Sequence, residues 1–273
     1  MPVIATNTSA NSALIYLNKN SAAQDKSLSK LASGSRIVRA SDDAAGLAVG
    51  SALKADVTTL KQAATNAVQA RSVLQTADGA LARVGDILQR MKSLATQSIS
   101  GSVADTGGRD FIDAEYQQLV SEISDIANQT TFNGEALLTG NYSGDKAEFQ
   151  VGIEATDVIE ADLSAVNLSN LTATGNVSTA NLAATESAAL DADIDTVSEA
   201  RAKIGAYLSR FEYRGDVINS SIENLEAAQS AIMDVDIASE QTNFVSKQVL
   251  TEASIAALSQ ANQMKSSLLS LVR

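Results

Sequence analysis

The two ends of this chain share a pattern that its middle lacks. Residues 1–100 and 190–273 are rich in alanine, and apolar residues recur in them every three or four positions, whereas Ser, Thr, Asn and Gly dominate much of the stretch between them. Side chains with that spacing return to the same face of an α-helix. A single proline, Pro2, leaves the rest of the chain free of the strongest helix breaker. We therefore expect a mostly α-helical fold, an antiparallel, coiled-coil-like bundle made from paired N- and C-terminal segments.

Two long helices are expected at the centre of this bundle, over about 43–99 and 188–232. In each, apolar residues fall at successive seven-residue spacings, which is typical of coiled-coil packing. Aromatic residues make up only 4% of the chain, so the core must rely on many small contacts between closely packed helices. The core residues expected in this rod are Leu60, Leu74, Leu81, Leu88, Val197, Ile204, Phe211, Ile218 and Leu225.

The outer helices, expected over about 8–32 and 236–271, have weaker apolar stripes. Gln, Ser and Asn interrupt them, so an isolated pair would be marginally stable in water. We expect these helices to require helices of neighbouring subunits. The residues expected to form the shared seam are Leu14, Leu17, Leu28, Leu31, Val245, Val249, Met264, Leu268 and Leu271.

The remaining segments carry shorter signals. A third helix is expected over about 109–129, and Glu148–Ile153 with Asp157–Leu163 favour a small β-hairpin. Residues 164–187 are small and polar, which predicts a short surface insert. Before the long second helix, Ser41 is the expected N-cap and the two aspartates after it the acidic first turn.

Composition opposes several classes of function. The net charge of −12 disfavours binding to nucleic acid and to anionic membranes. The chain has no His and no Cys, so the commonest general base, the commonest metal ligand and any thiolate nucleophile are missing. We expect no catalytic residue, no cofactor and no metal site. A helical lyase-type enzyme acting through Lys, Ser and carboxylates is the catalytic alternative, but no convergent polar cluster supports it.

One acidic motif could suggest a metal site. Asp191, Asp193 and Asp195 alternate as at the start of a calcium loop, yet Thr196 stands where that loop needs glycine. We interpret these carboxylates as residues at a helix N-terminus, where they complement the helix dipole.

The N-terminal residues show neither a basic region nor a continuous apolar stretch. A cleaved signal peptide is therefore not expected, and no apolar run reaches the ~18 residues that span a membrane. We expect the protein to stay in the cytoplasm or to leave it by a specialised route.

Five segments together resemble the bacterial flagellins. They are Ser29–Ile37, Ala40–Ala48, Asn128–Gly134, Leu258–Gln263 and Leu268–Arg273, and the resemblance covers roughly 1–140 and 190–273. It implies a short flagellin without the large outer domains, an extracellular subunit of the helical filament that drives motility. It also implies export by the flagellar type III route. The implied partners are other copies of the chain and the flagellar cap, junction and export-chaperone proteins. A hook–filament junction protein is a related alternative.

The resemblance also implies a division of the chain. Residues 1–34 with 236–273 correspond to the terminal helices of the filament core, and 35–46 to a spoke linker. Residues 47–163 with 188–235 correspond to the helical rod domain with its β-hairpin, which leaves 164–187 as the short insert.

A further implied partner is the vertebrate flagellin-sensing Toll-like receptor. Residues 89–97 resemble the segment that this host innate receptor reads, together with a Glu on the next helix. Arg90, Leu94 and Glu115 match the pattern, whereas Ser93 stands where the family usually has Glu. We expect receptor recognition to be retained but weakened.

Overall fold

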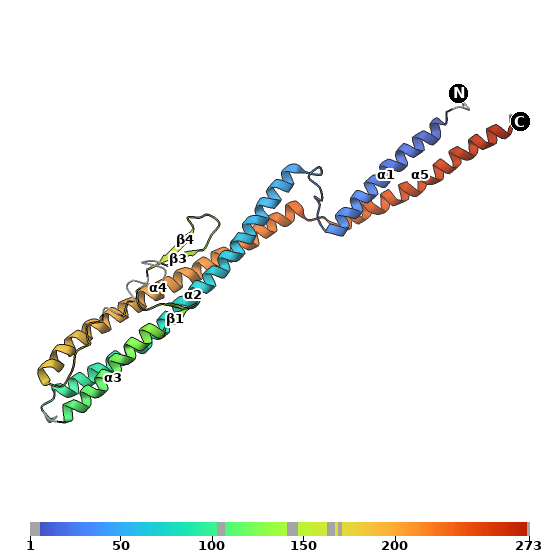
Figure 1. Cartoon of the computed structure of the whole chain (residues 1–273). Helices are drawn as coiled ribbons and strands as arrows, with labels where there is room; N and C mark the ends of the chain where they lie inside the picture. Colours follow the sequence, from blue (N-terminus) through green and yellow to red (C-terminus); the bar gives the residue numbers. More distant parts are fainter. Residues whose placement is uncertain (1–5, 103–106, 141–146, 163–166, 169–170, 272–273) are drawn as a thin grey trace. The chain divides into compact units, whose positions relative to one another are not determined.

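The fold is mostly helical, as the sequence predicts. The computed structural model describes the chain except residues 1–5, 103–106, 141–146, 163–166, 169–170 and 272–273 (Figure 1). Its helices are α1 (Thr8–Ser33), α2 (Ala44–Ile99), α3 (Gly108–Gln129), α4 (Ala180–Met233) and α5 (Ile237–Leu271). Strands β1 (Thr131–Phe132) and β2 (Glu135–Ala136) form one antiparallel hairpin, and β3 (Ala147–Gln150) and β4 (Val158–Ala161) form another. Among the described helices, none combines the length and hydropathy needed to cross a membrane.

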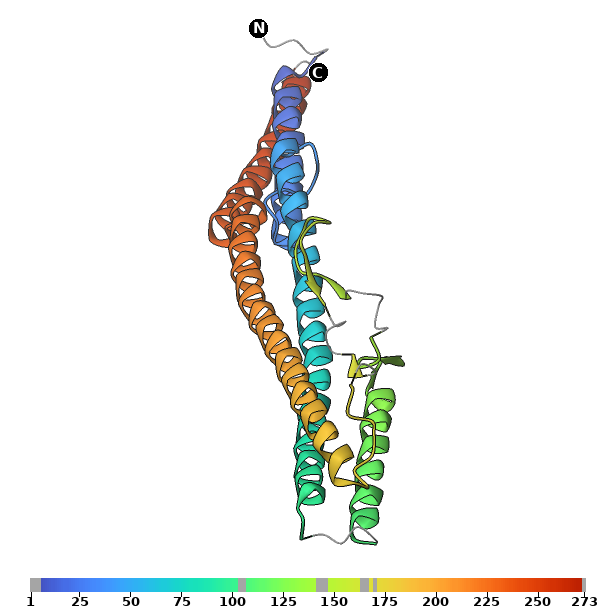
Figure 2. The ribbon, with the colours of Figure 1, turned by 90° about the vertical axis from the view of Figure 1, so that its left-hand side faces the viewer.

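Two compact units divide the chain. The first unit comprises residues 1–56 and 224–273, and the second comprises residues 57–223. In the first unit, α1 and α5 run side by side in opposite directions (Figures 1 and 2). Their facing residues are half-buried and largely polar or small, and Ser27 is the one buried residue of α1. This helix pair therefore buries little apolar surface on its own.

The segment between α1 and α2 is fastened by backbone hydrogen bonds. Gly34 ends α1 at φ 70°, a left-handed conformation that glycine adopts without steric cost. The Arg36 amide donates to the Met233 carbonyl at 2.6 Å, and the Val235 amide donates to the Gly34 carbonyl at 3.1 Å. Ile37 is 4% exposed, so this segment also contributes an apolar anchor.

The N-cap of α2 is Asp43, not Ser41 as the sequence suggested. The Asp43 carboxylate accepts a hydrogen bond from the Gly46 amide at 2.9 Å, which satisfies one of the unpaired donors of the first turn. Asp43 immediately precedes the first helical residue, so its side chain is the one within reach. Asp42 instead accepts from the Val38 and Arg39 amides and forms an ion pair with Lys26 at 2.8 Å.

In the second unit, α2 and α4 contribute the seven-residue stripes that form its core. Eight of the nine expected rod residues are buried, namely Leu60, Leu74, Leu81, Leu88, Val197, Ile204, Phe211 and Ile218. The prediction for Leu225 was wrong, because this residue is half-buried and lies in the first unit. No α4 residue from Asn219 to Met233, all of which the structure describes, is buried. Full burial needs the extra cover that α3 and the hairpins give in the second unit.

The β3–β4 hairpin confirms the predicted pair of strands, with a narrower extent than expected. Phe149 pairs with Ile159 across it, and the Phe149 ring meets the Phe211 ring edge-on at a centroid distance of 5.5 Å. The β1–β2 hairpin was not predicted. Its turn is Asn133–Gly134, where both residues have positive φ.

The segment 164–187 does not behave as a surface insert. Leu168, Ala173, Val177 and Ala183 are buried, and residues from Ala180 onward belong to α4. Small side chains allow this segment to lie close to the helices, whose polar groups satisfy its backbone. Residues 163–166 and 169–170 of the expected insert lie outside the described residues.

Candidate assembly surfaces

Exposed apolar side chains gather on α1 and α5. We call these residues the terminal apolar surface: Leu14, Ile15, Tyr16, Leu28, Ile237, Val245, Val249, Leu250, Ile255 and Met264, all of them exposed. Burying a side chain of this size contributes about 1.5–3 kcal/mol, and exposed apolar surface of this extent is typical of an interaction site.

The residues expected in the seam divide into three groups. Leu17 and Leu31 are half-buried on the face of α1 that meets α5. Leu14, Leu28, Val245, Val249 and Met264 are exposed. The side chains of Leu268 and Leu271 lie outside the part of the chain that the structure describes.

The face of α5 that meets α1 is not its valine-rich stripe. It carries half-buried residues at spacings of three and four, namely Phe244, Lys247, Thr251, Ser254 and Leu258. The Asn20 amide group donates to the Ser254 hydroxyl at 3.4 Å across this contact. The more apolar stripe of α5 is thereby left available to other chains.

Formal charge is distributed unequally between the two units. Residues 1–56 and 224–273 contain nine acidic and nine basic residues, whereas residues 57–223 contain 23 acidic and 11 basic residues. The whole net charge of −12 therefore belongs to the second unit. Since like charges repel at close range, copies of the chain can approach each other through the first unit at the lowest electrostatic cost.

The linker carries one strongly perturbed carboxylate. A hydrogen bond from Lys26, helped by the Arg39 amide, lowers the pKa of Asp42 from 3.8 to about 2. Arg36 donates from Nε and Nη2 to the Ile232 carbonyl at 3.0 and 2.8 Å, and its Nη2 lies 3.6 Å from the Asp43 carboxylate. At neutral pH, ionised groups thus stabilise this conformation of residues 36–43.

Asp193 does not lie where the sequence predicted. It lies in the interior of α4, not at a helix N-terminus, and it is 3% exposed. Its carboxylate accepts hydrogen bonds from the Thr172 amide and hydroxyl at 3.0 Å and from the Ala173 amide at 2.8 Å. The pattern Asp-x-Asp-x-Asp gave no sign of this, except that Asp193 falls four residues before the core residue Val197. This contact ties Thr172 and Ala173 to α4.

Further polar contacts hold the same segment against α2 and α3. The Val177 amide donates to Asp113 at 2.6 Å, and the Ser98 hydroxyl donates to the Val177 carbonyl at 2.5 Å. The Tyr116 hydroxyl donates to the Ala173 carbonyl at 3.2 Å, and it lies 3.1 Å from a Glu186 carboxylate oxygen. Burial raises the pKa of Tyr116 well above its usual range, so the hydroxyl stays protonated.

The receptor-like residues lie in two different environments. Arg90 on α2 donates from Nε and Nη2 to one carboxylate oxygen of Glu115 on α3, at 2.9 and 2.6 Å. Both side chains are about half exposed. Leu94, by contrast, is 2% exposed and belongs to the core of the second unit. The expectation that Leu94 contacts a receptor was therefore wrong, because its place in the seven-residue pattern turns it inward.

No group of three or more acidic residues within the described ranges is placed to hold a metal ion. The features that the structure brings together are those of an assembling protein: a first unit with no net formal charge and with exposed apolar side chains on α1 and α5, and a well-packed acidic second unit.

Comparison with known proteins agrees with this picture. The family model for the bacterial flagellin N-terminal helical region matches residues 4–143, and the model for the C-terminal helical region matches residues 187–272. A flagellin of Halalkalibacterium halodurans is 40% identical over 251 residues, 91% of each chain. The flagellar filament 33 kDa core protein of Treponema phagedenis is 36% identical over 286 residues, which are 99% of this chain and 100% of that protein.

A solved flagellin structure is also similar to this chain. The crystal structure of Bacillus cereus flagellin is 32% identical and superposes with a TM-score of 0.52, covering 60% of this chain and 94% of that chain. These relatives favour a filament subunit over a hook–filament junction protein. The chain belongs to the bacterial flagellin family and is a structural subunit of the flagellar filament.

Proposed function

We propose that residues 1–34 and 236–273 polymerise into the inner core of the filament, with 35–46 as the spoke and 47–163 with 188–235 as the surrounding rod domain. The observation that carries this proposal is the terminal apolar surface on a unit with no net formal charge. Burying several such side chains between copies supplies the driving force for assembly. The role is structural rather than catalytic.

One substitution pair tests which unit forms the core. Val249→Asp places a charge on the terminal apolar surface, whereas Asn243→Asp adds the same charge to an exposed polar position of the same helix. An unpaired charge is costly to bury, so seeded elongation should stop for Val249→Asp and continue for Asn243→Asp. Sedimentation and electron microscopy measure the polymer. Normal filaments from Val249→Asp would exclude this surface from the core.

The proposal includes export by the flagellar type III route without a cleaved signal peptide, with help from an export chaperone and from cap and junction proteins. The chain contains no Cys, so no disulfide opposes the unfolding that a narrow channel requires. Secretion should be lost in a host strain that lacks the flagellar export apparatus. Mass spectrometry of the secreted chain should find its N-terminal region uncut, and a shortened N-terminus would contradict this route.

We also propose that the Arg90–Glu115 pair takes part in recognition by the host receptor, without Leu94. An exposed arginine is a frequent anchor of protein interfaces, and Ser93 beside it is exposed where the family usually has Glu. Ser93→Glu should raise the response of receptor-reporter cells to monomer, and Arg90→Ala should lower it. Intact filaments should signal weakly, because the same face would pack against a neighbour. Equal responses from all three monomers would refute this role.

A further inference from the structure

An open groove lies between the β3–β4 hairpin and α4 of the second unit. Its volume is about 480 Å³, and its walls include Val158 and Ile159 from the hairpin and Tyr213 and Val217 from the helix. Tyr213 is 72% exposed and Val217 is 55% exposed, so apolar surface in this groove is left uncovered. Such a site gains free energy when an apolar side chain fills it.

The groove also carries positive charge, although the unit around it is strongly acidic. Arg210 and Arg214 both line it, and Asp157 is the one carboxylate among its lining residues. Asp157 already pairs with Arg214 at 3.5 Å, while Arg210 lies 6.0 Å from the centre of the Tyr207 ring. An occupant with an aromatic side chain next to a carboxylate would match both properties of the groove.

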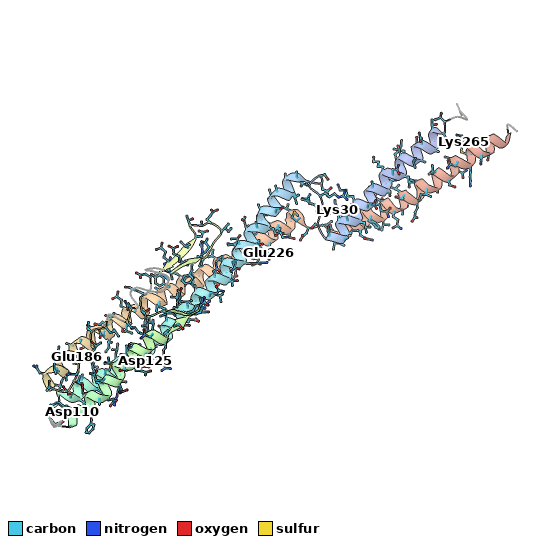
Figure 3. All side chains as sticks on the ribbon, in the orientation of Figure 1. Lys30, Asp110, Asp125, Glu186, Glu226 and Lys265 are labelled. Carbon is cyan, nitrogen blue, oxygen red and sulfur yellow. The ribbon has the colours of Figure 1, made fainter. Side chains whose placement is uncertain are left out.

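An exposed aromatic side chain next to a carboxylate is found at the start of α3 in the same unit. Phe111, in the first turn of α3, is 79% exposed, more than any other large apolar residue that the structure describes. Asp110 precedes it, and Figure 3 shows Asp110 at the end of α3. The buried Arg109 donates to the Ser98 carbonyl at 2.8 Å, which fastens this turn to the end of α2. Phe111 is thus exposed on a helical turn that is fastened to α2.

We propose that Phe111 and Asp110 of one copy dock in the Arg210–Tyr213–Val217 groove of the next copy. This contact rests on the proposed self-assembly, and it gives the second unit a specific role in it. The ring fills the apolar part of the groove while Asp110 approaches Arg210. The Asp110 carboxylate is exposed and therefore available to a second chain.

Charge favours Phe111 over Val68, which is also strongly exposed in the second unit. Val68 on α2 is 61% exposed, but Lys61 and Arg71 lie seven residues before and three residues after it, on the same helix face. If Val68 of one copy entered the groove of another, Lys61 and Arg71 would approach the arginines of the groove and repel them. A copy that offers Phe111 brings a carboxylate.

The two surfaces cannot meet within one copy. Asp113 accepts a hydrogen bond from the Val177 amide, so the start of α3 lies level with the start of α4. Tyr213 lies 36 residues beyond Val177, mostly along α4, which is about 50 Å at 1.5 Å per residue. The contact is therefore made between copies, and when it is repeated head-to-tail without closing into a ring it generates an open row.

Cross-linking in assembled filaments tests the contact directly, because the natural chain has no Cys. Ala114→Cys lies one turn after Phe111, and Thr156→Cys lies on the rim of the groove, so both leave the docking residues intact. Copies with one cysteine each are mixed, polymerised and treated with a short bismaleimide. We expect a covalent dimer from the 114/156 mixture, and at least tenfold less from either variant alone or from a mixture of Gln69→Cys with Thr156→Cys.

Charge reversal gives an independent readout. Asp110→Arg and Arg210→Glu should each raise the critical concentration for polymerisation about fivefold, and together they should return it to within about twofold of wild type. Asp125→Arg, farther along α3 (Figure 3), should not rescue Arg210→Glu. Normal filaments without the 114/156 dimer, or a double variant no better than its parents, would overturn the docking contact. Failure of the wild-type chain to polymerise would instead refute the proposed assembly.

Discussion

Replacing Asp193 by alanine should destabilise the second unit more than any change to a neighbouring aspartate. Asp193 is 3% exposed, and its carboxylate accepts three hydrogen bonds from Thr172 and Ala173 at 2.8 to 3.0 Å. A hydrogen bond to a charged group contributes about 1.5–3 kcal/mol, and donors left unpaired in a buried site add their desolvation cost. The three bonds share one acceptor group, so their contributions are not additive.

We expect Asp193→Ala to lower the free energy of unfolding by about 3–5 kcal/mol and Asp193→Asn by about 1–2 kcal/mol, because asparagine keeps one acceptor oxygen. Asp195→Ala is the matched control. This residue has the same chemistry, lies two positions further along α4 and is exposed. Exposed substitutions of this kind change stability by about 0.5 kcal/mol or less.

Urea denaturation followed by circular dichroism measures all three variants in the monomer. With a slope of about 2–3 kcal/mol per molar urea, Asp193→Ala should move the midpoint down by about 1–2 M. Hydrogen exchange should show faster exchange of the Thr172 and Ala173 amides in the same variant. If Asp193→Ala and Asp195→Ala unfold at the same urea concentration, the hydrogen bonds of Thr172 and Ala173 to Asp193 contribute nothing to stability.

Three further outcomes are expected. The pKa of Asp42 is lowered to about 2, so the ionised carboxylate stabilises the linker above its ordinary pKa near 4, and this stabilisation is lost as the pH falls through 2. Asp42→Asn should therefore speed hydrogen exchange of the Val38 and Arg39 amides at pH 5 but not at pH 2. Raising the ionic strength from about 0.01 to 0.15 M shortens the Debye length from about 30 to 8 Å, which screens the charge of −12 on the second unit and should lower the critical concentration for polymerisation, measured by sedimentation. Amides of α1 and α5 should exchange much faster in the monomer than those of α2 after Val57, and should become protected in filaments, because the helix pair by itself buries little apolar area.

Four of the five helices could be predicted almost to the residue, because their signals are local, whereas α4 begins at Ala180, well before the expected start near residue 188. The seven-residue spacing from Leu60 to Leu88 states which face of α2 is apolar, and any partner that covers this face buries the same residues. The same spacing wrongly predicted that Leu225 is buried, because a pattern within one helix does not show where the neighbouring elements end. The resemblance to flagellins rested on contiguous segments, and the comparisons confirmed it.

The sequence by itself determined the helical class, the bounds of every helix except the start of α4, and the family. Only the tertiary structure decided which groups are available to other molecules. It buried Leu94, which the family pattern offered as a contact, and it gave Asp193 a partner 20 or more residues away in the chain. It also directed the polar face of α5 towards α1 and left Val249 exposed. Periodicity fixes the relative directions of side chains around one helix, whereas burial depends on which other helices cover it, and those lie far away in sequence.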